Sequence, residues 1–487
     1  MKILLVYPQY PETFWSFKKA LKYVSKEANL PPLGLLTIAS LLPEEFDKKL
    51  IDMNVDKLTD KDLLWADYVF ISAMITQKNS VNIIIERCKK LGVKLVAGGP
   101  LFTSLHEEFP DVDHFVLNEG EVTLPLFLED LKNGNPKKIY TSDIKPDLTK
   151  SPIPQWNLLN PKKYLKMPIQ CSRGCPFDCE FCDIVNLNGR IPRYKEPAQI
   201  IEEIEALYQE GCHLSIFIVD DNFIGNKIKA KEILKALMEW RKRRKSHITF
   251  TTEVSLNVAD DDELLSLMRE AGFDSVFIGL ETPSKESLQE CGKFQNKNRD
   301  PIISVRKIQN YGIEVSAGFI VGFDSDDASI FERQIEFIQK SGVVVAMVGL
   351  LNALPGTKLY ERLKKENRLL KDSSGNNTDF STNFLTKMDL STLINGYKNI
   401  ISSIYSPENY YNRIKTFLEY YKPYNKSSFG LKDIKALIKS IYILGLFQKN
   451  RKYYWKIFFT SLFKYPKSFP KAITMVIYYE HFSVIFA

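Results

Sequence analysis

Three closely spaced cysteines are the residues of this chain best suited to chemistry. Cys175, Cys179 and Cys182 form a C-x3-C-x2-C motif, and the aromatic Phe181 directly precedes the last of them. Soft thiolates suit iron–sulfur clusters, so three of them in one loop can bind three irons of a 4Fe-4S cluster. The fourth iron is then left without a protein ligand and can bind a small molecule.

Part of this motif is compatible with other chemistry. A C-x2-C pair such as Cys179 and Cys182 can form a redox pair or half of a zinc site. A zinc site would need a second ligand pair a dozen or more residues away. Three further cysteines are isolated: Cys88, Cys212 and Cys291. Cys171 repeats the first spacing with Cys175, but only one register gives the full motif, so we expect Cys171 to be a buried bystander at a strand end.

The full motif resembles the signature of the radical S-adenosylmethionine enzymes. The resemblance implies that the open iron binds the amino and carboxylate groups of S-adenosyl-L-methionine, which the reduced cluster cleaves to a 5′-deoxyadenosyl radical. It also implies an external one-electron reductant of the flavodoxin or ferredoxin type. Seven cysteines, four of them clustered, do not form a secreted disulfide framework and favour a reducing cytoplasm.

Size and composition predict a multidomain globular protein. A chain of 487 residues exceeds a single core, so we expect two or three domains. The apolar run at residues 1–8 is too short for a signal peptide and predicts a buried strand. We find no stretch of 18 uninterrupted apolar residues, so we expect no spanning helix.

Residues 1–145 alternate short apolar runs with helical patterns. The predicted strands are Ile3–Tyr7, Lys49–Asp52, Tyr68–Ala73, Lys94–Ala97 and His114–Leu117. This alternation predicts an α/β domain with a parallel, doubly wound, Rossmann-like sheet. Ligands of such sheets bind beyond the carboxyl ends of the strands, and no G-x-G-x-x-G follows the first strand, which argues against a dinucleotide.

Together with the cysteine motif, this layout resembles the cobalamin-binding (B12-binding) domain that precedes many radical S-adenosylmethionine methyltransferases. The resemblance implies cobalamin contacts from residues at the strand ends: Ser72, Gly98, Gly99, Glu119, Gly120 and Glu121. A D-x-H-x-x-G motif is absent, so we expect no histidine below the cobalt. The alternative is a degenerate sheet that only covers the next domain.

Residues 146–166, with Pro152, Pro154 and Pro161 among them, read as a linker. Over residues 167–375 the predicted strands are Met167–Gln170, Ser215–Val219, Ile248–Glu253, Ser275–Leu280, Glu314–Val321 and Val343–Leu350, with helical patterns between them. The resemblance implies a partial (β/α)6 barrel of the TIM type. The cluster loop follows the first strand, at the carboxyl end where barrel chemistry occurs.

Polar residues end other strands of this barrel. The resemblance implies that Asp220, Glu253 and Glu281 hold the methionine and ribose parts of S-adenosyl-L-methionine, with Gly318 beside the adenine and Phe181 within the cofactor-binding loop. Each of these residues can instead be a surface carboxylate or an ordinary strand residue. The basic run at residues 241–245 closes a helix, where cations are favoured, so we do not expect a nucleic-acid partner from it.

Residues 376–487 lose the β/α alternation and predict a mainly helical extension. Residues 422–487 contain twelve Lys or Arg and two acidic residues, which gives this segment a net charge of +10. The rest of the chain therefore has a net charge of −3. Basic and aromatic residues alternate in Lys449–Phe459 and Leu462–Lys467. This pattern suits peripheral contact with an anionic membrane without a spanning segment, and equally a nucleic acid or a packed helical domain.

The resemblance covers residues 1–420 and is closest to the hopanoid C-2 methylase-like subgroup. It implies hydrogen abstraction from an unactivated carbon of a lipid or other small molecule, followed by methyl transfer from methylcobalamin. The open alternatives are a radical enzyme that performs cyclisation or rearrangement over a degenerate cobalamin domain, and a non-catalytic cobalamin or cluster sensor. The strand-end acids argue against a sensor, because binding alone does not require them.

Overall fold

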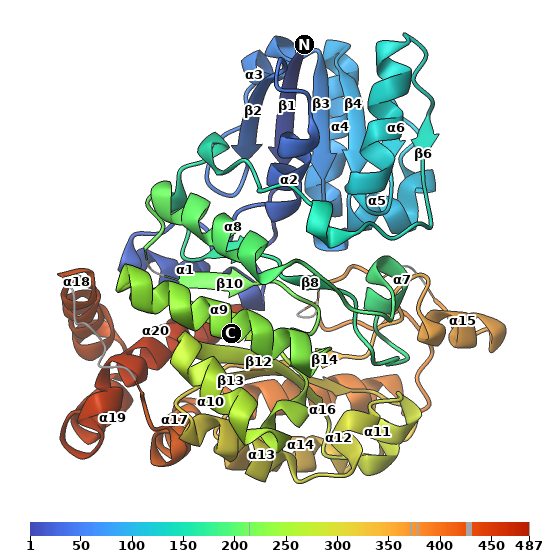
Figure 1. Ribbon diagram of the computed structural model, residues 1–487. Helices are drawn as coiled ribbons and strands as arrows, with labels where there is room; N and C mark the ends of the chain where they lie inside the picture. The colour runs from blue at the N-terminus through green and yellow to red at the C-terminus, as the bar shows by residue number, and fades with distance from the viewer. Residues whose placement is uncertain (214, 371–372, 377–378, 425–430, 487) are drawn as a thin grey trace.

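The first sheet of the computed structural model is parallel and six-stranded (Figure 1). The structure describes residues 1–213, 215–370, 373–376, 379–424 and 431–486. The strands are β1 (Lys2–Tyr7), β2 (Asp47–Asp52), β3 (Tyr68–Ser72), β4 (Lys94–Gly98), β5 (His114–Val116) and β6 (Ile139–Tyr140), in the order β2-β1-β3-β4-β5-β6. The order reverses between β1 and β3, which is where ligands bind in such sheets.

Helices cover both faces of this sheet. One face packs on α2 (Leu33–Leu41) and α6 (Gly120–Lys132). The other packs on α3 (Asp60–Trp65), α4 (Lys78–Leu91) and α5 (Pro100–Leu105). Residues 3–6 of β1 are all fully buried, because a parallel sheet covered on both faces needs continuous apolar strands. The doubly wound architecture is therefore confirmed.

The second sheet is also parallel and six-stranded. Its strands are β7 (Met167–Ile169), β10 (Ser215–Ile218), β11 (Thr249–Glu253), β12 (Phe273–Glu281), β13 (Glu314–Val321) and β14 (Ala346–Leu350), in the order β14-β13-β12-β11-β10-β7. The helices between them are α8 (Pro197–Gln209), α9 (Lys227–Arg244), α10 (Asp262–Ala271), α13 (Pro301–Asn310) and α14 (Ile330–Ser341). Strands β7 and β14 are the two edges, so this is the expected partial barrel.

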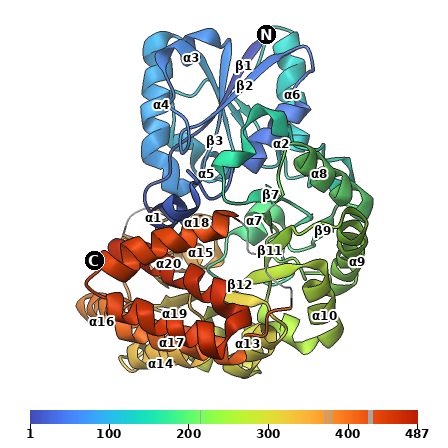
Figure 2. The same cartoon turned by 90° about the vertical axis from the view of Figure 1, so that its left-hand side faces the viewer.

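The remaining chain is mainly helical, as predicted. Its helices are α16 (Leu390–Ile404), α17 (Pro407–Tyr420), α18 (Leu431–Ser440), the π-helix η9 (Ile441–Phe447), α19 (Arg451–Lys464) and α20 (Phe469–Ile485). Figure 2 shows α17, α19 and α20 together on one side of the barrel. The hydroxyls of Tyr397 and Tyr405 donate to the carbonyls of Val348 and Ala346, at 2.9 and 2.7 Å. Helix α16 thereby covers the β14 edge of the barrel.

The first residues after β1 also reach this helical region. Segment 14–24, which contains the 3-10 turn η1 (Phe14–Ser16) and helix α1 (Lys18–Leu21), packs on α20. The ring of Phe14 stacks on Phe482 at 4.5 Å between centroids. Segment 14–24 and the C-terminal helix therefore meet beside the barrel. Within the described ranges, no helix combines the length and apolar character needed to cross a membrane.

Candidate active site between the two sheets

The cluster loop lies between two short elements that the sequence pattern did not predict. Strand β8 (Ser172–Arg173) pairs antiparallel with β9 (Arg193–Tyr194), and helix α7 (Ile184–Asn188) follows the cysteines. Cys182 donates its N–H to the carbonyl of Cys179 at 3.1 Å. The hairpin thus closes a compact loop that carries all three motif cysteines.

Polar groups surround these thiols. The amide of Asn222 lies 4.0 Å from the Cys175 sulfur, and that of Gln295 lies 3.8 Å from the Cys179 sulfur. Burial raises the pKa of each thiol, and for Cys182 to about 12. N–H donors around sulfur stabilise a bound cluster.

Three thiols in one loop suit an iron–sulfur cluster. In the parts of the chain that the structure describes, no three His, Cys, Asp or Glu side chains lie close enough to bind one metal ion. An iron–sulfur cluster offers each cysteine a different iron, so its thiols need not converge. Beside Cys179, the buried Oε1 of Gln295 has no hydrogen-bond partner, which fits a polar group bound at this position.

Asp220 fixes the chain that leads into the loop. Its carboxylate accepts the N–H of Cys171 and the hydroxyl of Ser172, both at 2.7 Å. Burial raises the pKa of Asp220 to about 7. The Cys171 thiol is fully buried, as a bystander would be, and burial raises its pKa well above the usual value.

Glu281 and Lys293 form a buried ion pair near the cysteines. Lys293 Nζ lies 2.7 Å from Glu281 Oε1. Glu281 has a left-handed backbone (φ 63°) where the pairing of β12 with β13 is irregular. Burial would lower the pKa of Lys293, but Glu281 and the thiols of Cys179 and Cys182 raise it. A strained residue held by an ion pair is common at functional sites.

Glu253 ends the neighbouring strand, β11. It pairs in register with Phe277 of β12, and burial raises its pKa to about 7. Successive strand residues alternate between faces, and Phe319 of β13 packs outward on Phe337 of α14 at 5.6 Å. Glu253, Phe277 and Gly318 belong to the opposite set, so they face the barrel interior.

Beside these acids an apolar patch lines the barrel interior, whereas the next residues down the same face, Thr251 and Ser275, carry hydroxyls 2.8 Å apart. A Cβ on Gly318 would lie 3.1 Å from the Phe277 ring, which shows how closely the two residues approach. Trp15, from the segment after β1, contacts the same ring edge-on at 5.3 Å between centroids. Its Nε1 donates to the sulfur of Met347 at 3.1 Å. The first domain therefore contributes an aromatic wall to the barrel.

Glycines keep the carboxyl edge of the first sheet free of side chains. A Cβ on Gly98 would lie 2.6 Å from the carbonyl oxygen of Val116. One on Gly99, which has φ +86°, would lie 2.3 Å from Ser72 Oγ. Glycine at both positions therefore lets the chain at the end of β4 pack closely on its neighbouring strands. The buried His114 lies at the other end of its strand, where its ring nitrogen pairs with the carbonyl of Lys137.

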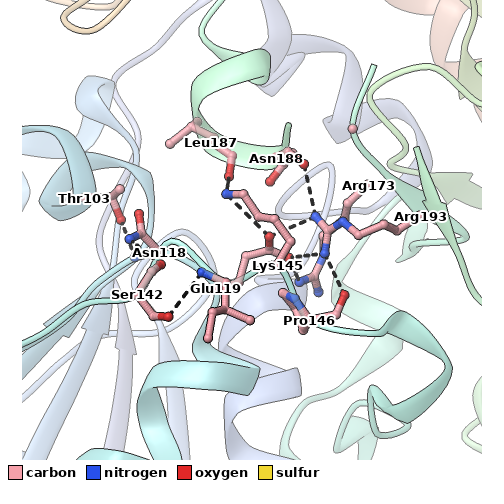
Figure 3. Close-up of polar contacts among 12 residues, drawn as sticks. Thr103, Asn118, Glu119, Ser142, Lys145, Pro146, Arg173, Leu187, Asn188 and Arg193 are labelled. Atoms are coloured by element: carbon pink, nitrogen blue, oxygen red, sulfur yellow. Dashed lines mark hydrogen bonds and ion pairs between the residues drawn. The ribbon is translucent and has the colours of Figure 1, made fainter. Parts of the chain in front are cut away.

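Glu119, which Figure 3 shows beside Arg173, Arg193 and Lys145, and Glu121 join the two sheets. Arg173 contacts Glu119 at 2.8 Å and Glu121 at 2.7 Å. Arg193 binds both oxygens of Glu119, at 2.8 and 3.0 Å, and Lys145 lies 3.7 Å away. We call these five residues the polar junction. The polar junction anchors Arg173, at the start of the cluster loop, to the turn that begins α6.

Comparisons with known proteins agree with this geometry. Residues 24–128 match the B12 binding domain, residues 169–338 the radical SAM superfamily, and residues 357–487 a domain of unknown function (DUF4070). An uncharacterized methyltransferase from Synechocystis sp. is 42% identical, over 99% of this chain and 91% of the relative. The hopanoid C-2 methylase of Rhodopseudomonas palustris is 37% identical, over 84% of this chain and 77% of that protein.

The chain belongs to the cobalamin-dependent radical S-adenosylmethionine methyltransferases. Enzymes of this family use a 4Fe-4S cluster, S-adenosyl-L-methionine and cobalamin, as the sequence predicted. Solved structures share the fold: OxsB with aqua-cobalamin bound has a TM-score of 0.65 at 16% identity, covering 99% of this chain and 79% of that one. TsrM from Kitasatospora setae has a TM-score of 0.61 at 16% identity, covering 77% and 79%.

Several residues of this methyltransferase site were not predicted from sequence. They are Trp15, Arg173, Arg193, Asn222, Lys293 and Gln295. Two signals were available: the arginines flank the cysteine motif, and Trp15 lies in the aromatic run Phe14–Phe17 directly after the first strand. Neither signal names a partner, because the partners lie far along the chain.

Proposed function

We propose that this methyltransferase methylates an unactivated carbon of an apolar, lipid-like substrate held in the barrel below the cofactors. The observation that carries the proposal is the apolar wall of Trp15, Phe277 and Met347 on the inner face of the barrel. The name of the hopanoid C-2 methylase supports the same substrate class. We also propose the division into 1–145, 146–166, 167–375 and 376–487 as functional units.

The residues at the strand ends support the following roles. Cys175, Cys179 and Cys182 would hold the cluster, whose open iron and S-adenosyl-L-methionine supply a hydrogen-abstracting radical, while cobalamin supplies the methyl group. Residues proposed around S-adenosyl-L-methionine are Phe181, Glu253, Glu281 and Gly318. Asp220 acts through the loop it fixes. The cobalamin contacts proposed are Ser72, Gly98, Gly99 and Gly120, with the backbone of Glu119 and Glu121.

The side chains at this site would orient the cofactors and the substrate and exclude water. The buried pair of Glu281 and Lys293 places a carboxylate and an ammonium group beside the thiols. The apolar wall keeps water from the substrate carbon, which limits quenching of a radical. An external flavodoxin- or ferredoxin-type reductant would supply the electron.

The first test is product identification. Lipids and metabolites of cells with and without this chain are compared by untargeted mass spectrometry, and we expect an apolar product that is one CH2 heavier. A cyclised product of unchanged carbon count would instead support the rearrangement alternative. If the anaerobically reconstituted protein forms no 5′-deoxyadenosine, a sensor role replaces the enzyme.

The second test concerns the apolar wall. In Trp15→Ala, we expect a higher KM for the identified substrate with retained cleavage of S-adenosyl-L-methionine, because Trp15 contacts substrate space and not the cluster loop. Trp65→Ala is the matched control, since Trp65 lies on α3 beneath Lys49. An unchanged KM in Trp15→Ala would contradict the proposed location of the substrate.

We further propose peripheral contact with an anionic membrane through α19 and its neighbours. Phe459, Leu462 and Phe463 of α19 are 49, 38 and 78% exposed, beside exposed Lys456 and Lys464. Basic residues near a membrane surface each contribute about 1 kcal/mol. Full-length protein should float with anionic liposomes at low salt and less at high salt, and Phe463→Glu should float less than wild type. Equal flotation of both proteins would refute this contact.

A further inference from the structure

A second apolar site lies outside the barrel, where segment 14–24 packs against helices α18 and α20. It is a cavity of about 140 Å3. Its principal lining residues come from segment 14–24 and from helices α18 and α20: Phe17, Leu21, Val24, Leu437, Ile473 and Ile477. None of these residues belongs to the cofactor site described above.

The chemistry of the lining favours hydrocarbon over water. Thr474 also lines the cavity, but its hydroxyl donates to the carbonyl of Pro470 in the same helix at 3.0 Å. An apolar cavity of about this size can hold a molecule such as benzene. When it is empty, its lining atoms lose dispersion contacts. A hydrocarbon group would restore those contacts without breaking a hydrogen bond.

Phe17 shapes one wall of this cavity. Its backbone is left-handed, with φ 47°, which is unusual for a bulky residue. Its ring lies 5.0 Å from that of Tyr478 and 5.5 Å from that of His481. Trp15, two residues earlier, faces the barrel instead. The segment therefore separates the cavity from the proposed substrate space, so the two sites are distinct.

An apolar path leads from solvent to the cavity. Residues three and four positions apart share one face of a helix, so Ile434, Leu437 and Ile438 of α18 point the same way. Leu437 lines the cavity, whereas Ile434 and Ile438 are 41 and 60% exposed. Across the opening, Val24 is 38% exposed. Exposed apolar residues that continue into a cavity are typical of an interaction site.

The charges at this opening are positive. Lys22, Lys435 and Lys439 are exposed there, and Lys439 Nζ donates to the carbonyl of Lys22 at 3.2 Å. This contact joins the two sides of the opening. A cationic rim around an apolar path complements a ligand with an anionic head and a hydrocarbon chain.

We propose that this cavity, together with the exposed apolar path that leads to it, binds one hydrocarbon chain of an anionic phospholipid from the bilayer. The proposal rests on the membrane contact proposed above and is independent of methyl transfer. The bound chain would fill the space between segment 14–24 and α18. It would thereby stabilise the packing of that segment on α18 and α20. It also assigns to the helical extension a role as a lipid-binding region.

The test uses the full-length chain and cis-parinaric acid, a fluorescent fatty acid, without vesicles. Wild type should bind it saturably. Ile473→Trp should fill the cavity and weaken binding roughly ten-fold or more, with an unchanged or higher Tm. Ile443→Trp is the matched control, because Ile443 is 36% exposed and not among the lining residues, and it should bind like wild type. If Ile473→Trp does not fold, Leu437→Trp blocks the cavity from α18.

Two further arms identify the ligand. Combined Lys435→Glu and Lys439→Glu substitutions should weaken binding of the acid more than that of its methyl ester. With vesicles that contain phosphatidylglycerol, Ile473→Trp should float less than Ile443→Trp. The proposal that the cavity is a lipid site is overturned if wild type shows no saturable binding of cis-parinaric acid. It is also overturned if Ile473→Trp binds the acid as well as wild type does. Equal flotation with weakened parinarate binding overturns the assignment to a bilayer lipid while leaving methyl transfer untouched.

Discussion

Among the contacts between the first domain and the rest of the molecule, two differ in kind. The polar junction joins carboxylates of the first sheet to arginines beside the cluster loop. The apolar junction, which we define as Phe14, Phe17, Tyr478 and Phe482, joins segment 14–24 to α20. Forked arginine–carboxylate pairs fix both distance and angle, whereas apolar packing tolerates repacking. The more directional contact lies where cofactors must face each other.

The largest effect is expected from removing a cysteine of the cluster loop, which the polar junction holds against the first sheet. In Cys179→Ala, we expect complete loss of the visible iron–sulfur absorbance and of S-adenosyl-L-methionine cleavage, because only three thiols are available to the cluster. Cys171→Ala is the control and should retain both signals, since Cys171 lies in a buried position outside the motif. A wild-type cluster spectrum in Cys179→Ala would disprove the ligand assignment.

The next largest effect concerns the junction itself. Arg173→Ala leaves Glu119 and Glu121 buried without this partner, and breaking a buried pair costs roughly 3–5 kcal/mol. This cost is measured as the difference in the free energy of unfolding between wild type and Arg173→Ala in urea titrations. The control is Arg190→Ala: its guanidinium is 57% exposed and 3.6 Å from Asp178, so we expect about 0–1 kcal/mol. Equal losses in both variants would show that the junction is energetically a surface contact.

Acid should weaken the polar junction selectively. Burial alone would raise the pKa of Glu121, but hydrogen bonds and the charge of Arg173 lower it from 4.5 to about 2. A depressed folded pKa gives stability that is present above pH 4.5 and lost as the pH falls toward 2, by about 3 kcal/mol. The difference in unfolding free energy between wild type and Glu121→Gln should shrink over that range. A constant difference would contradict the pKa shift.

The smallest expected effect lies at Ile477, which lines the cavity and directly precedes Tyr478 of the apolar junction. Ile477→Val removes one methylene next to the cavity and should cost roughly 0.5–1.5 kcal/mol. Because no charge is involved, the cost should be the same at low and high salt, and at pH 4 and pH 7. Salt dependence similar to that of Arg173→Ala would erase the distinction between the two junctions.

Sequence reasoning located the sheets because most of their strands, such as β1 and β3, are short apolar runs. All eleven predicted strands exist within a few residues of their expected positions, since burial on both faces leaves an unambiguous pattern. The strands β6, β8 and β9 were missed because two residues are too few to show a period. The cysteine loop was equally readable, because its spacing is local.

The partners of the site residues were not readable. Arg173 and Arg193 reach Glu119 across 54 and 74 positions, and Trp15 reaches Met347 across 332. Local patterns specify elements, whereas such contacts depend on how the two sheets dock. The sequence therefore indicated Glu119 and Glu121 as residues at a ligand-binding edge but gave no sign of their role in joining the domains.

The stacking of Phe14 on Phe482 has a consequence for synthesis on the ribosome. The two rings are 468 positions apart, and chains elongate at about 5–20 residues per second. The aromatic segment at residues 14–17 therefore waits roughly 25–90 seconds for its partner helix to emerge. During that interval its rings have no native cover from α20. A nascent chain that pauses late should accordingly be a substrate for chaperones that bind exposed aromatic segments.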